Sequence, residues 1–113
     1  MKMQVQRIQN NNYTTNFGAS VSQETTHWLR NAMSDISRDR FATRLKNMQT
    51  WGQEDSVVSY CIQGLNKDKF VLTNPRLGDK EVAITEKTNN MLTTFFDKIN
   101  EEEIVNAEKA LSK

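Results

Sequence analysis

The sequence is poor in the residues that build most recognisable chemical sites. It contains a single cysteine, Cys61, and a single histidine, His27. A lone cysteine cannot form an intramolecular disulfide and cannot supply a cysteine-based zinc site. No local motif pairs His27 with Cys61, so an enzyme that relies on either residue is a remote alternative. We expect the protein not to be an enzyme and to hold no cofactor or metal ion.

Glycine and long apolar runs are also scarce. The four glycines are isolated, at positions 18, 52, 64 and 78, whereas a phosphate-binding loop needs clustered glycines ahead of a helix. No stretch approaches the ~20 apolar residues of a membrane-spanning helix. The basic start of the chain lacks the apolar core of a signal peptide. We therefore expect a cytoplasmic protein that is not associated with a membrane.

The positive and negative charges of the chain nearly balance, since the net charge of the 113 residues is +1. Residues 1–53 carry seven Lys or Arg and three Asp or Glu, whereas residues 54–113 carry eight and eleven. Ordinary surface charge explains this mild asymmetry. A nucleic-acid-binding domain typically gathers several cations on one basic surface. Nucleic acid is therefore an alternative partner that the sequence does not favour.

What the sequence does contain is a polar start followed by a normally apolar body. Hydrophobic residues make up 36% of the chain and charged residues 26%, which is lean but above the disordered range. The stretch 9–16 is almost wholly Asn, Gln and Thr with one Tyr. We expect residues 1–20 to form a flexible Asn-rich N-terminal arm, with Phe17 as its anchor, and residues 21–113 to form a single α+β domain.

The first 20 residues carry a loose resemblance. The Asn-rich tract and the Asn16-Phe17-Gly18-Ala19 segment that follows it look like the start of many small uncharacterised bacterial proteins. The resemblance implies a bacterial source and no particular activity.

Two helices are predicted after the arm. Ser22 suits the N-cap position of the first. Two apolar stripes follow at helical spacing: Leu29, Met33 and Ile36, and then Phe41, Leu45 and Met48. On one straight helix the two stripes would point roughly 120° apart and could not reach a single core. We therefore predict a break at Ile36–Asp39, with Ser37 capping the second helix and Gly52 ending it.

Three short runs rich in β-branched and aromatic residues predict strands. They span Val57–Gln63, Phe70–Thr73 and Glu81–Thr85. The side chains expected to face the core are Val58, Tyr60, Ile62, Phe70, Leu72, Val82 and Ile84. Short connections favour antiparallel neighbours, so we predict a three-stranded meander with one polar face.

Two further helices are predicted after the meander. Thr85 or Thr88 is expected to cap the first of them. The second has the signature of a capping box, with Asn100 at the N-cap and Glu103 three residues later. The acidic run 101–103 matches the positive end of the helix dipole, and consecutive helical residues diverge too much to share one metal ion.

The predicted fold is thus α+β. It has two N-terminal helices, a three-stranded antiparallel meander, and two C-terminal helices packed on one face of the sheet.

The function that the sequence favours is a non-enzymatic protein–protein interaction module. A sheet edge or the N-terminal arm could pair with a partner chain or with a second copy in a homodimer. The alternative is a nucleic-acid-binding domain that uses the basic second helix, where Arg40 and Arg44 share a face. The residues expected to contact a partner are Phe17, Trp28, Arg40, Arg44, Trp51, Arg76 and Leu77.

Overall fold

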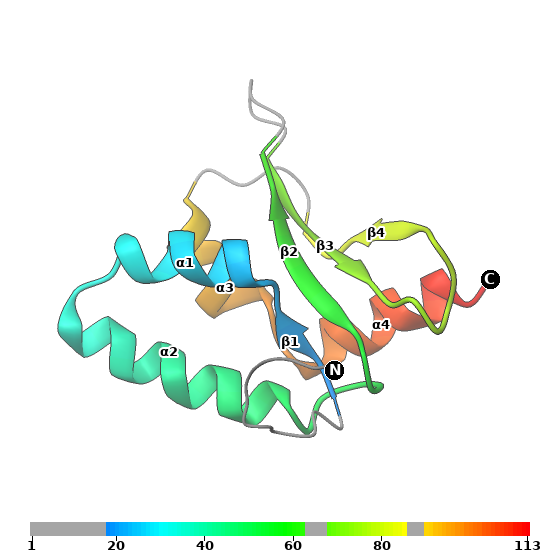
Figure 1. The fold of residues 1–113 in the computed structure, drawn as a ribbon, viewed down its shortest axis with the longest axis horizontal. Coiled ribbons are helices and arrows are strands. Elements are labelled where there is room, and N and C mark those ends of the chain that lie inside the picture. The colour runs from blue at the N-terminus through cyan, green and yellow to red at the C-terminus, as the bar shows by residue number, and fades with distance from the viewer. Residues whose placement is uncertain (1–17, 63–67, 86–89) are drawn as a thin grey trace, which may run out of the picture.

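The computed structural model describes residues 18–62, 68–85 and 90–113, and it confirms the α+β class. The elements in chain order are β1 (Ser20–Val21), α1 (Gln23–Asn31), α2 (Asp35–Met48), β2 (Val57–Cys61), β3 (Lys69–Thr73), β4 (Glu81–Ala83), α3 (Met91–Lys98) and α4 (Glu101–Leu111). In Figure 1, α1 and α2 lie beside the β1 edge of the sheet, and α4 passes behind β2.

The sheet contains the predicted meander and one strand more. β2, β3 and β4 are antiparallel neighbours, with Val58 opposite Leu72 and Leu72 opposite Val82. The additional strand is β1, which pairs with β2 in parallel, so the sheet is mixed and its order is β1-β2-β3-β4. A two-residue strand has too few positions to show alternation, which explains why the sequence did not reveal it.

The pairing of β1 also moves the boundary of the predicted arm. Ser20 donates its N–H to the carbonyl of Ser56 at 2.9 Å, and Ala19 is fully buried. Residues 18–20 are therefore part of the folded body rather than of the arm. The remainder of the arm, including Phe17, lies outside the described residues.

The break between the first two helices exists, but it comes earlier than predicted. α1 ends at Asn31, and Ser34 rather than Ser37 caps α2, its hydroxyl accepting the Ser37 N–H at 3.3 Å. The shift leaves Met33 in the core, whereas Ile36 is 78% exposed and does not belong to the buried stripe. Ile36 therefore lies on the outer surface of α2.

The end of α2 also differs from the prediction. The helix ends at Met48, before the predicted stop at Gly52. Gly52 lies in the connection that follows and has φ +68°, a conformation that glycine adopts without strain.

One apolar cluster joins all four described helices to one face of the sheet. The sheet contributes Val58, Phe70 and Leu72, and the helices contribute Leu29, Phe41, Met48, Phe95, Ile104, Ala107 and Leu111. The ring of Phe95 lies 5.4 Å from that of Phe41 and 5.8 Å from that of Phe70, measured between centroids. Ile62, predicted to face this core, is instead 60% exposed beyond the end of β2.

The two C-terminal helices begin at asparagines. Asn100 caps α4 as predicted, since its Oδ1 accepts the Glu103 N–H at 3.0 Å. The cap of α3 is Asn90, whose side chain accepts the Thr93 N–H at 3.0 Å. Of the two predicted caps, Thr85 instead accepts the Phe70 N–H, and Thr88 lies outside the described residues.

Candidate interaction surface

Two arginines of α2 are held against aromatic rings of other elements. The guanidinium of Arg40 lies over the Phe96 ring of α3, 4.9 Å from its centroid. That of Arg44 lies over the Trp51 ring at 5.6 Å and donates to the backbone carbonyl of Phe96. Such stacking fixes a guanidinium without neutralising its charge.

Neither arginine is paired with a carboxylate in the part of the chain that the structure describes. The ion pairs found there belong to Arg38, with Asp35, and to Arg76, with Glu54 and Asp55. Arg40 is exposed and Arg44 is half-buried. The two guanidiniums can therefore bind an anionic group of another molecule.

The sequence of α2 aligns these arginines with other polar side chains. Ile36, Arg40, Thr43 and Asn47 follow one another at spacings of four, three and four residues. This spacing places side chains on a single stripe of a helix. Arg44 borders the stripe on the side that faces α3. We call this surface the arginine face, formed by Ile36, Arg40, Thr43, Arg44, Asn47 and Phe96.

The arginine face is hollowed. A depression of about 270 Å³ is lined by Arg40, Thr43, Arg44, Asn47 and Phe96, none of which is acidic. Guanidinium, hydroxyl and amide groups can all donate hydrogen bonds, and arginine binds carboxylate and phosphate through paired donors. The hollow is thus suited to an anionic group with an apolar neighbour.

Arg44 also has a role in the fold. Phe96 lies in the last turn of α3, where backbone carbonyls have no partner within the helix. A cation at such an end is favourable to the helix dipole. Arg44 therefore links α2 to α3, whereas the exposed Arg40 is the cleaner probe of binding.

The other predicted contact residues are placed differently. Trp28 is half-buried on α1. The guanidinium of Arg76 lies 2.7 Å from a carboxylate oxygen of Asp55, and this hydrogen bond and the charge of Glu54 raise its pKa. Leu77 is half-buried, because part of its side chain packs against the core. No hydrogen bond, ion pair or ring contact described for Arg40 or Arg44 involves these three residues.

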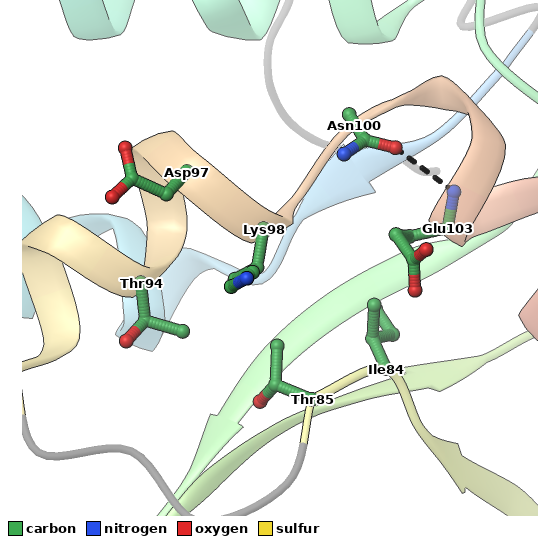
Figure 2. A pocket seen from close by; sticks show the side chains of 7 residues that line it. All are labelled: Ile84, Thr85, Thr94, Asp97, Lys98, Asn100 and Glu103. Carbon is green, nitrogen blue, oxygen red and sulfur yellow. Dashed lines mark hydrogen bonds between the residues drawn. The ribbon is translucent and has the colours of Figure 1, made fainter.

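A second hollow lies where β4 ends beside the junction of α3 and α4 (Figure 2). Its volume is about 520 Å³, and its walls are Ile84, Thr85, Thr94, Asp97, Lys98, Asn100 and Glu103. In Figure 2 the Glu103 carboxylate points towards Ile84, and Asp97 points away from it. The charges are of mixed sign, and Asn100 and Thr85 already accept backbone N–H groups. Asn100 and Thr85 thus have structural roles, in capping α4 and in closing the end of the sheet.

A buried polar network, which sequence reasoning missed, joins α4 to the connection after α2. Glu108 is only 2% exposed, and its Oε2 accepts the Gln53 N–H at 2.6 Å and the hydroxyl of Ser56. Asn74, also buried, donates to the Ser56 oxygen at 2.9 Å. A signal was present, because Glu108 follows the buried Ile104 by four residues and shares its helical face.

The residues for the remote enzymatic alternative lie on different elements. His27 is exposed on α1, and its ring nitrogen lies 3.1 Å from the side-chain nitrogen of Asn31. Cys61 is half-buried at the end of β2. Among residues 18–62, 68–85 and 90–113, no three His, Cys, Asp or Glu side chains are grouped so that they could hold a metal ion.

No helix in the described ranges combines the length and the hydropathy that a membrane-spanning helix requires. Comparison of the chain with protein-family models, with curated proteins and with solved structures finds no match.

Proposed function

We propose that this protein is a non-enzymatic protein–protein interaction module that docks through the arginine face onto an acidic segment of a partner. The observation that carries the proposal is Arg40, an exposed guanidinium stacked on Phe96 with no carboxylate partner among the described residues. Arginine and aromatic residues are enriched at the energetic centres of protein interfaces. The hollow between α2 and α3 adds polar donors around that guanidinium.

Preorganisation supports this surface as a docking site. A free arginine loses side-chain entropy when it is immobilised at an interface, at a cost of about 0.5–1.5 kcal/mol. The stack of Arg40 on Phe96 and the bond from Arg44 to the Phe96 carbonyl restrict both side chains before a partner arrives. Part of that cost is therefore already met within the fold.

The sheet edges, which we expected to be docking sites, are less well suited. Among the described residues, the sheet is edged by β1, with two residues, and by β4, with three. Very short edge strands are one way in which proteins prevent edge-to-edge pairing. β-Augmentation needs a longer row of free main-chain groups, so we favour the arginine face.

Nucleic acid could meet the same two arginines, but the surroundings favour a protein. Single-stranded binding combines a cationic groove with open aromatic rings on which bases stack. Here the Arg40 guanidinium already lies over the Phe96 ring and the Arg44 guanidinium over the Trp51 ring, so these rings are less open for bases to stack on. The net charge of the chain, +1, also provides little long-range attraction for a polyanion.

The proposal is tested with a flexible, fluorescein-labelled peptide of Glu, Gly and Ser and with a labelled oligothymidine, both at low salt. We expect the peptide to bind, and we expect Arg40→Gln to weaken its binding by roughly five- to tenfold, because a charged hydrogen bond contributes about 1.5–3 kcal/mol before screening. Arg38→Gln is the matched control, since it removes the same charge from an arginine paired with Asp35 on the same helix.

Fluorescence anisotropy gives the dissociation constants. The proposal would be overturned by absence of peptide binding or by equal losses in the Arg40 and Arg38 variants. Tighter binding of oligothymidine than of the peptide, with the same dependence on Arg40, would assign the surface to nucleic acid instead.

A further inference from the structure

The arginine face has an apolar end. Ile36 is 78% exposed, more than any other large hydrophobic residue of the described ranges, and it lies one turn before Arg40. An isolated exposed isoleucine needs no explanation. This one, however, continues the stripe that leads through Arg40 and Thr43 to Asn47.

The spacing of this stripe matches the seam of a helix pair. Intervals of four, three and four residues are those at which one helix presents side chains to a second helix packed along it. The stripe runs over the twelve residues 36–47 of α2, and its ends lie about 16 Å apart at 1.5 Å per residue step. A helix of roughly three turns would cover it from end to end.

We infer that the partner segment is an acidic amphipathic helix of about three turns that packs along α2. An apolar side chain of that helix covers Ile36. Carboxylates about one turn further along it bind the guanidiniums of Arg40 and Arg44. This inference rests on the proposed function and specifies the shape and the chemistry of the partner.

A second copy of the described domain does not offer such a helix. Its acidic helix is α4, which begins with Glu101, Glu102 and Glu103. The apolar stripe of α4, formed by Ile104, Ala107 and Leu111, is buried in its own core. Acidic and apolar side chains are thus not displayed together on a free face of α4, so the occupant we propose is a different chain.

Two alanine-rich peptides of identical composition and about 14 residues distinguish a helix from any other acidic segment. One peptide carries leucine and glutamates at helical spacing on one face. Its isomer carries the leucine on the opposite face, and circular dichroism confirms equal helicity. We expect the matched peptide to bind roughly tenfold more tightly than the isomer, which corresponds to about 1.4 kcal/mol, because only the matched peptide places its leucine on the apolar surface of Ile36.

The variants Ile36→Ala and Ile62→Ala locate the apolar contact. Both residues are exposed large hydrophobics, and Ile62 lies beyond β2, so neither change removes a core side chain. Ile36→Ala should abolish most of the preference for the matched peptide, whereas Ile62→Ala should leave it unchanged. Stability of each variant is checked by thermal unfolding.

The outcomes separate this inference from the proposed function. Equal binding of the two isomers, or an unchanged preference in Ile36→Ala, would overturn the helical partner. The proposed function would survive that result if the flexible acidic peptide still depended on Arg40. A dimer in light scattering that Ile36→Ser dissociates would also overturn the inference, because a second copy would then cover the face.

Discussion

Replacement of Glu108 should show that a buried carboxylate holds α4 to the connection after α2. The carboxylate accepts two hydrogen bonds at Oε2, one from the Gln53 N–H and one from the Ser56 hydroxyl. A hydrogen bond to a charged group contributes about 1.5–3 kcal/mol. Truncation also leaves the buried Ser56 hydroxyl and the part-buried Gln53 N–H without this acceptor. Glu108→Ala should therefore lower the free energy of unfolding by about 3 kcal/mol.

An isosteric change at the same position separates the charge from the hydrogen bonds. In Glu108→Gln the amide oxygen can occupy the place of Oε2 and accept both donors. The bonds become neutral, so we expect a loss of about 1 kcal/mol. The matched control is Glu102→Ala on the exposed side of α4, which should cost no more than about 1 kcal/mol.

Urea unfolding followed by far-ultraviolet circular dichroism measures these differences, with the m-value checked for constancy. A loss for Glu108→Ala no larger than that for Glu102→Ala would refute the argument that the network stabilises the fold. A loss for Glu108→Gln as large as that for Glu108→Ala would show instead that the negative charge itself is required.

Three further predictions concern the fold. Gly52→Ala should destabilise the protein by about 2 kcal/mol or more, because the residue has φ +68° and a Cβ would lie 2.5–2.7 Å from the Glu108 carboxylate oxygens. Gly78→Ala also strains the backbone, because Gly78 has φ +127°. A Cβ there meets nothing within 4 Å, so we expect it to cost less than Gly52→Ala, where strain and a steric clash add, and thermal unfolding ranks the two. Asn100→Ala should cost about 1 kcal/mol in urea unfolding through loss of the α4 cap, and no loss would refute that role. Burial, followed by the charge and the hydrogen bond of Asp68, raises the pKa of the Tyr60 hydroxyl above its usual 10.0. The stability that Tyr60 gains in this way is complete below pH 10 and is lost as the pH rises through the pKa of the folded state. In Asp68→Asn, absorbance at 295 nm should show that the pKa of Tyr60 is lower.

The elements that the sequence predicted correctly are those specified by local chemistry. Asn100 followed by Glu103 gave the start of α4, and Asn100 does accept the Glu103 N–H. The alternation around Val58, Phe70 and Leu72 gave the inner face of the meander, and all three are fully buried. Caps and period-2 patterns depend on neighbours in the sequence, so they can be read without a fold.

The features that were missed depend on contacts between distant segments. β1 exists because Ser20 and Val21 pair with β2 about 37 residues later, and two residues carry no pattern of their own. The helix break was set too late because Ser34 and Ser37 are equally good caps by residue type. The choice of Ser34 turns Ile36 out of the core.

The candidate site was predictable in part. The spacing of Arg40 and Arg44 predicted that they share a face of the second helix, and both line the hollow on α2. Phe96 could not be assigned to that site, because only the packing of α3 beside α2 brings its ring under Arg40. Arg76 was a candidate by its place in a loop, but Asp55, 21 residues earlier in the chain, occupies its guanidinium.

If α2 presents the docking surface, binding of an acidic helix should perturb the backbone amides of α2, and a chemical-shift map measures this. The isotope-labelled protein is titrated with the matched acidic helical peptide, and amide shifts are followed by ¹H–¹⁵N correlation spectra. We predict that the largest shifts lie between Ile36 and Asn47 and at Phe96, and that Arg40→Gln reduces them. Shifts concentrated at β1 or β4, or around the hollow of Figure 2, or no saturable shifts at all, would show that α2 is not the docking surface.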